Sequence, residues 1–302
     1  MRARLNPVMR RLGFDEGDRV AIVHADDLGM AQATVTAFEE LIEFGLVSSG
    51  AVMVPCPWFP ALAELCRRHP EADVGVHLTL TSEWDAYRWG PISTRGVGSG
   101  LLDDEGYLPR TVAQVQANAS VDAVTAEMEA QVARALEAGI DVTHVDTHMG
   151  TVAAPQFIPA YIQLAMAHGL PPMVPRYDEQ QWLEFGLDAG TAAFAAPFVE
   201  GLEAQGVPLL DHLTGLHLGD DGDRLELAKA TIDALPAGIT HLIIHPAKDT
   251  PELRAATPKT WRARAADYEV FKSEALRAHV RNAGVQIVGY RAIRDLMRQS
   301  MR

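Results

Sequence analysis

Histidines and aspartates gather in four short segments of this chain, and together they are the ligand types of a catalytic metal site. The segments read HADD at 24–27, VGVHLTL at 74–80, THVDTHM at 143–149 and HLIIH at 241–245. One carboxylate and two imidazoles can bind a divalent cation and leave coordination positions open for water and substrate. Asp27, His77 and His148 fit such a set, and these ligand types suit Zn²⁺ without excluding Mg²⁺, Mn²⁺ or Fe²⁺.

In two of these segments, the spacing of the residues predicts which face of a strand their side chains share. Asp26 and Asp27 are neighbours, and neighbours in an extended chain point to opposite sides, so both reach one opening only at the frayed end of a strand. His144, Asp146 and His148 alternate and therefore share one face. So many ionisable groups on buried strands are costly unless they are paired or bind a ligand. A single histidine is more often an ordinary surface or core residue, so the prediction depends on the combination.

The elements that must position these groups are short apolar runs separated by amphipathic helical stretches. Strands are expected at residues 20–23, 49–54, 73–80, 142–149, 172–176, 213–218, 240–245 and 285–290. Alternating strands and helices are typical of βαβ units and a parallel sheet. Seven or eight such units favour an α/β fold of the TIM-barrel type, an irregular (β/α)7–8 barrel, whose strands bring their carboxyl ends to one mouth. The first strand is not followed by a glycine-rich nucleotide-binding motif.

Residues 82–118, after the third strand, are expected to form an insertion or lid within a single domain that spans residues 1–302. The segment is rich in glycine and proline and is too long for a plain connection between two elements. Trp84, Tyr87 and Trp89 lie in it. Trp84 could bind substrate by stacking on a sugar ring, and it could equally anchor the long loop.

The composition excludes some classes of partner. The chain has 26 Lys and Arg against 40 Asp and Glu, which gives a formal net charge of −14. This charge disfavours nucleic acid and anionic membranes, because few cations would neutralise their phosphates. No apolar stretch approaches the roughly 20 residues that span a bilayer. The two cysteines, Cys56 and Cys66, favour the cytoplasm as the location. A homodimer is left open.

The four segments resemble, in order and spacing, the motifs of the YdjC/ChbG family of carbohydrate deacetylases, distant relatives of the polysaccharide deacetylases with a barrel-like β/α fold. The likeness extends from residue 20 to residue 290. It implies a hydrolase that removes an acetyl group from an N-acetylated sugar or short oligosaccharide. It also implies that Asp27, His77 and His148 hold one divalent ion, Zn²⁺ or Mg²⁺. Asp26 would be the general base, and His245 would stabilise the oxyanion or protonate the leaving amine.

Further polar residues are expected around this site. Asp146 and His144 are expected to orient His148 or its strand, because a carboxylate often accepts the free N–H of a ligating imidazole. Three more residues are candidates to complete the mouth, the first of them as a substrate contact: Arg176, Arg264 and Asp267.

The chain departs from the family pattern at positions where a substrate would touch. His24 stands where many members have asparagine, Gly150 and Val152 where many have histidine, and Ala247 where many have glycine. These departures remove no metal ligand, and they leave the exact sugar open. Two other functions are also open: hydrolysis of another amide, an ester or a phosphate on the same scaffold, and non-catalytic carbohydrate binding by the same barrel.

Overall fold

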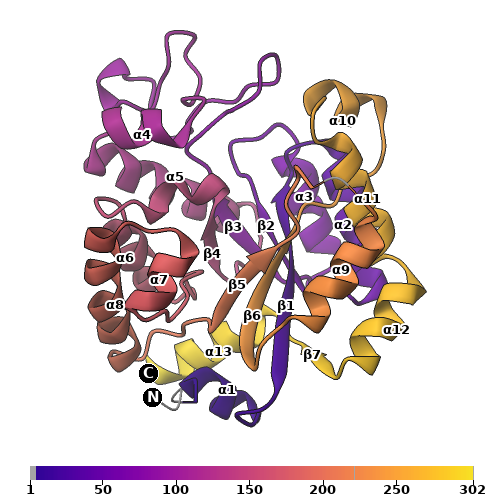
Figure 1. Cartoon of the computed structure of the whole chain (residues 1–302). Helices are drawn as coiled ribbons and strands as arrows, with labels where there is room; N and C mark the ends of the chain where they lie inside the picture. The colour runs from indigo at the N-terminus through magenta and orange to yellow at the C-terminus, as the bar shows by residue number, and fades with distance from the viewer. Residues whose placement is uncertain (1–4, 221, 302) are drawn as a thin grey trace.

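The computed structural model describes residues 5–220 and 222–301 and builds the chain around a curled, all-parallel sheet flanked by helices (Figure 1). The sheet consists of β1 (Arg19–Leu28), β2 (Ser49–Val52), β3 (Val74–Leu78), β4 (Val145–Thr147), β5 (His212–Gly215), β6 (Gly238–Ile244) and β7 (Val285–Ile287). The strand order is β4-β3-β2-β1-β6-β5, and β7 pairs with the first residues of β1. The expected parallel, barrel-like α/β architecture is confirmed.

The expected strand at 172–176 is an extended segment between the two ends of this strand order. Isolated bridges pair Pro172 with Val145 of β4, and Pro175 with Leu210, which precedes β5. A proline has no N–H to donate, so a segment with prolines at 171, 172 and 175 makes only an interrupted ladder. The other expected strands form, several of them shorter than expected.

Helices follow the strands and cover the outside of the sheet. The longest, α5 (Val121–Glu137), begins where the Ser120 side chain accepts the Ala123 N–H and contains neither glycine nor proline. The remaining helices are α1 (Pro7–Leu12), α2 (Gln32–Phe44), α3 (Phe59–Arg68), α4 (Val112–Asn118), α6 (Ile158–His168), α7 (Glu179–Phe185), α8 (Ala189–Ala204), α9 (Arg224–Asp233), α10 (Pro251–Ala256), α11 (Trp261–Phe271), α12 (Glu274–Asn282) and α13 (Tyr290–Ser300). Short 3₁₀ turns are η1 (Val97–Ser99) and η2 (His148–Ala153).

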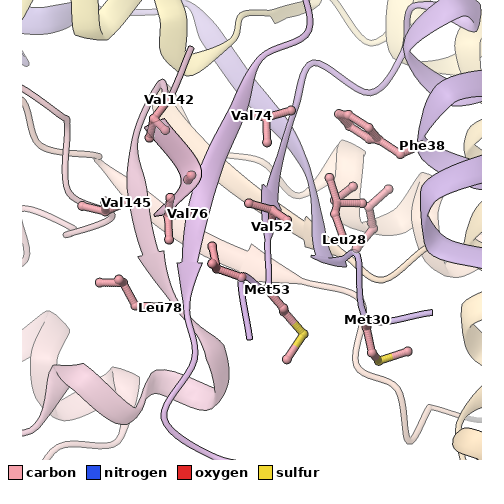
Figure 2. Packing of buried hydrophobic residues seen from close by; sticks show 14 of the residues in the cluster. Leu28, Met30, Phe38, Val52, Met53, Val74, Val76, Leu78, Val142 and Val145 are labelled. Atoms are coloured by element: carbon pink, nitrogen blue, oxygen red, sulfur yellow. The ribbon is translucent and has the colours of Figure 1, made fainter. Parts of the chain in front are cut away.

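The core lies between the sheet and its helices, and the central strands are buried on both faces, as continuous apolar runs require. Figure 2 shows Phe38 of α2 beside Leu28 of β1, with Val52 on the neighbouring strand. Gly50 of β2 leaves the space that these side chains fill, because a Cβ there would lie 2.6 Å from Leu28 Cδ1 and 2.9 Å from Phe38 Cε2.

The segment 82–118 lies at the end of the sheet toward which the strands point (Figure 1). It is held by buried contacts of its own: the Trp89 indole N–H donates to the Thr81 carbonyl, and Arg88 pairs with Asp103 at 2.6 Å. Both cysteines are free and buried. Along the described ranges, no helix combines the length and apolar character needed to cross a bilayer.

Candidate active site

A bulge at the end of β1 presents two neighbouring carboxylates on one side of the sheet. The pairing of β1 with β2 shifts register between Ala25 and Leu28, and Asp27 has a φ of 62°. This left-handed conformation breaks the strict alternation of an extended chain, and aspartate tolerates it better than most residues. As a result, Asp26 Oδ2 and Asp27 Oδ1 both approach His77 Nε2, at 3.8 and 3.5 Å.

The three expected metal ligands come together at the carboxyl ends of β1, β3 and β4. His148 Nδ1 lies 3.2 Å from Asp27 Oδ1 and 3.3 Å from His77 Nε2, and all three side chains are buried. Ligand atoms about 2.1 Å from one metal ion lie about 3.0–3.4 Å apart. Asp27 Oδ1 is buried, and no donor among the described residues makes a hydrogen bond to it. The three residues therefore fit a divalent cation.

In each candidate ligand, the second ring nitrogen or carboxylate oxygen, which does not face the other two ligands, has a charged partner. Asp146 Oδ1 lies 2.9 Å from His77 Nδ1, Glu83 lies 3.2 Å from His148 Nε2, and the Arg264 guanidinium lies 2.8 Å from Asp27 Oδ2. Partners of this kind fix ring orientation and leave the facing nitrogen free to bind a metal. The carboxylate in contact with His148 is thus Glu83, whereas Asp146 contacts His77.

Glu83 is a residue that sequence reasoning missed. It lies in the insertion, directly before Trp84, where a single carboxylate in a long polar loop has no distinguishing pattern. Its position beside His148 is set by the fold of residues 82–118, which no local periodicity specifies.

Burial and charge act against each other on these groups. Burial disfavours the charged form of Asp27, but Arg264 and the two imidazoles hold the pKa of its carboxyl well below the usual range. Burial likewise opposes the charge on the rings, yet Asp146 and Asp26 raise the pKa of His77, and Glu83 and Asp27 raise the pKa of His148 to about 9. The carboxylates therefore create a field that favours positive charge between them, as a cation site requires.

Asp26 and His245 lie beside this cluster. Asp26 Oδ2 is 3.9 Å from His245 Nε2, while Asp26 Oδ1 accepts a 2.7 Å hydrogen bond from His24 Nδ1. Burial opposes ionisation of Asp26, but His77 and His24 hold its pKa well below the usual range. Burial and the nearby Arg264 lower the pKa of His245, so its imidazole is neutral at neutral pH. Its side chain retains 20% exposure.

Helix α11 supplies two of the residues expected at the mouth. Arg264 reaches Asp27, and Asp267 accepts the His245 backbone N–H at 2.9 Å and the Arg224 Nε–H at 2.6 Å. Arg224, the first residue of α9, thereby ties α9 to α11. Asp267 contributes to the site by fixing the backbone that presents His245.

Arg176 lies elsewhere. Its guanidinium contacts Glu203 of α8 at 2.8 Å and Asp211 at 3.3 Å. Asp211 also accepts the Ile239 N–H at the beginning of β6, which is the end of the sheet opposite to Asp27, His77 and His148. This placement gives no support to the expected substrate contact of Arg176.

Trp84 lies near the cluster with its ring half-buried. The ring stacks on Tyr87 with centroids 6.2 Å apart, and the Arg264 guanidinium lies 5.8 Å from the Trp84 centroid. The Tyr87 hydroxyl donates to the Met30 carbonyl after β1. These contacts anchor the insertion to the mouth, and the stacking of Trp84 on a sugar stays a prediction.

His144 lies deeper in the sheet than the ligands. Its Nε2 is 2.8 Å from His24 Nε2, and its ring stacks on Tyr290 at 3.9 Å. These contacts link His144 to β1 and α13, and the expected orientation of His148 or its strand by His144 stays a prediction.

Several known proteins are similar to this chain over most of its length. The chain is 33% identical to a carbohydrate deacetylase of Thermus thermophilus over 96% of this chain and 99% of that protein. It is 26% identical to a carbohydrate deacetylase of Listeria monocytogenes over 89% of this chain and 98% of that protein. The crystal structure of a putative cellobiose-phosphate cleavage protein from Enterococcus faecalis superposes with a TM-score of 0.72 at 20% identity, over 91% of this chain and 99% of that chain.

The family comparison covers the whole site. Residues 20–282 match the model of the YdjC-like proteins, a range that includes both carboxylates of β1, the candidate ligands of β3 and η2, and the histidine after β6. The chain therefore belongs to the YdjC-like protein family.

Proposed function

We propose that this protein is a metal-dependent hydrolase that removes an acetyl group from an N-acetylated sugar or short oligosaccharide. The observation that supports this most strongly is the juxtaposition of one buried carboxylate and two imidazoles with a second carboxylate, Asp26, beside them. Relatives with the name carbohydrate deacetylase that span nearly the whole chain support the substrate class.

Asp27, His77 and His148 would hold the cation. A divalent ion bound there would polarise the acetyl carbonyl and make a bound water more acidic. The chain's own residues would carry the proton transfers. Asp26 Oδ2, on the side of His77 and His245, takes a proton from the attacking water as the water oxygen bonds to the acetyl carbon.

His245 would stabilise the negative charge that forms on the acetyl oxygen. A neutral imidazole N–H can donate a hydrogen bond to the negative charge that develops on the carbonyl oxygen. The C–N bond then breaks, and the amine takes a proton, which the protonated Asp26 can return. Asp267 holds the loop that carries His245, so the ring stays within reach of Asp26.

We also infer that the sheet is a closed, irregular (β/α)7–8 barrel. Backbone hydrogen bonds support this: Met173 donates to Val145 of β4, and Arg176 donates to Leu210, whose own N–H donates to Val174. The segment 171–176 would then take the position between β4 and β5. The insertion at 82–118 would act as the wall of the mouth, with Trp84 available to a sugar ring.

The test is a hydrolysis panel: acetate release is measured from N-acetylglucosamine, N,N′-diacetylchitobiose and an acetate ester, and phosphate release from a sugar phosphate. We expect turnover of an N-acetylated sugar that stops after chelation and returns with added Zn²⁺ or Mg²⁺. Asp27→Asn should lose both bound metal and activity, whereas Asp26→Asn should keep the metal and lose about 10²–10⁴-fold in kcat, the usual range for a general base. Full activity after verified metal removal would refute the proposal.

A further inference from the structure

A second layer of buried histidines lies directly behind the Asp26 carboxylate. His24, on the same strand, is fully buried, and its Nδ1 lies 2.7 Å from Asp26 Oδ1. An ionised carboxylate can only accept hydrogen bonds, so His24 Nδ1 carries the proton and donates it. Hydrogen bonds to a charged acceptor are stronger than neutral ones, especially when they are buried.

The His24 ring is itself fixed from behind. Its Nε2 meets His144 Nε2 at 2.8 Å, and it lies against the His241 ring with centroids 4.4 Å apart. Tyr290 stacks on His144 and its hydroxyl lies 2.8 Å from His241 Nδ1. Gly75 makes room for this layer, because a Cβ there would lie 2.5 Å from the His144 ring.

The arrangement divides the two oxygens of Asp26 between different tasks. Oδ1 is occupied by His24, while Oδ2 faces His77 and His245 at 3.8 and 3.9 Å. We propose that His24 is a positioning residue for the reaction, which directs Asp26 Oδ2 toward the substrate by holding Oδ1 through its Nδ1–H. This inference rests on the proposed function, in which Asp26 is the general base.

The same buried groups could instead bind a second cation, and His24 would then have a different function. One ligand atom from each of His24, Asp26, Asp146 and His241 lies within 4.8 Å of the others, and Asp146 Oδ2 and His241 Nε2 have no hydrogen-bond partner among the described residues. If these four residues held a second cation, His24 would be a ligand rather than a donor. The number of ions per chain separates the two cases.

Two substitutions separate the functions of the two ring nitrogens. His24→Asn keeps a side-chain amide N–H where Nδ1 now donates to Asp26. His24→Gln places its amide where Nε2 now meets His144 and leaves Asp26 Oδ1 without its donor. His168→Asn, on α6 and paired with Glu129, is the matched control outside the site. Kinetics use the N-acetylated sugar that the wild type turns over, and bound Zn²⁺ is counted for each protein.

We expect His24→Gln to lose about 30- to 100-fold in kcat, because misplacing a reacting group by an ångström costs up to about 10²-fold. KM should stay within about threefold of wild type, since binding contacts are unchanged. His24→Asn should recover to within about fivefold of the wild-type kcat, with one Zn²⁺ per chain in every protein.

Three results would overturn the inference: equal kcat in His24→Gln and wild type, equal losses in His24→Asn and His24→Gln, or two ions in wild type with one lost in His24→Gln. If circular dichroism shows that His24→Gln does not fold, the kcat of His24→Asn decides. His24→Asn keeps the donor to Asp26, so a loss in its kcat as large as that of Asp26→Asn would contradict positioning by a donated hydrogen bond. An inactive, metal-loaded wild type would instead refute the proposed function.

Discussion

Asp27 has a backbone conformation that a residue other than glycine adopts only at a cost of order 1–3 kcal/mol, and this conformation creates the pair of carboxylates at the mouth. The sequence shows the two aspartates and predicts that both reach the opening. It does not show the bulge, because the register shift depends on the pairing of β1 with β2. The four motifs therefore identify the candidate ligands, and the sheet determines which atoms face one another.

Glu83 shows where residue-level prediction ends. The sequence predicts that Asp146 orients His148 or its strand, but Asp146 contacts His77, and the carboxylate beside His148 comes from residues 82–118. Only the three-dimensional arrangement of the loop brings Glu83 to the ring, so neither spacing nor composition could have selected it.

The first prediction concerns this contact. Glu83→Ala removes the acceptor at His148 Nε2, so the ring loses its fixed orientation, and Zn²⁺ affinity should fall about 10- to 100-fold. Isothermal titration with Zn²⁺ measures the change. Glu105→Ala is the matched control, because Glu105 lies in the same insertion but pairs with Arg88 and Arg110. Equal Zn²⁺ affinities for Glu83→Ala and Glu105→Ala would show that Glu83 does not support the ligand.

Most strands were predictable because apolar runs buried on both faces have a distinct pattern, and β1 and β6 are the clearest examples. The strand expected at 142–149 is shorter than predicted: β4 ends at Thr147, and His148 begins a 3₁₀ turn in which Met149 has a φ of 53°. A pattern of apolar residues cannot reveal this turn, because the turn is formed by left-handed backbone conformations at Met149 and Gly150.

The second prediction concerns the packing of β2 against β1 and α2. Gly50→Ala inserts a methyl group 2.6 Å from Leu28 Cδ1 and 2.9 Å from the Ala25 carbonyl oxygen. Overpacking of this kind should lower the free energy of unfolding by about 1–3 kcal/mol. Urea denaturation measures the loss. Gly17→Ala, where nothing lies within 4 Å of an added Cβ, should change stability by less than about 0.5 kcal/mol, and similar losses in both variants would contradict the packing described.

At the scale of the whole molecule, segments far apart in sequence are tied together on the outside of the sheet as well as in its core. Glu40 of α2 pairs with Lys248 in the loop after β6 and with Lys272 after α11, and it accepts a hydrogen bond from Tyr268. These contacts lower the pKa of Glu40 from 4.5 to about 2. No sequence pattern links the segments, so this network could not be predicted.

The third prediction follows from the sign of that shift. A carboxyl whose pKa is lower in the folded state stabilises the fold above the unfolded-state value of 4.5, and the contribution disappears as the pH falls through about 2. At neutral pH, Glu40→Gln should therefore reduce the free energy of unfolding by about 1 kcal/mol, the upper range for exposed ion pairs. Urea denaturation over a pH series should show the two proteins converging in acid. A constant difference across the series would exclude this network as its source.

The proposed function depends on one cation held by Asp27, His77 and His148. A crystal grown with Zn²⁺ and measured at the zinc absorption edge tests this most directly. We expect one strong anomalous peak within about 2.0–2.2 Å of Asp27 Oδ1, His77 Nε2 and His148 Nδ1. Anomalous density that lies away from these three atoms, or a fully soaked crystal with no peak between them, would contradict it.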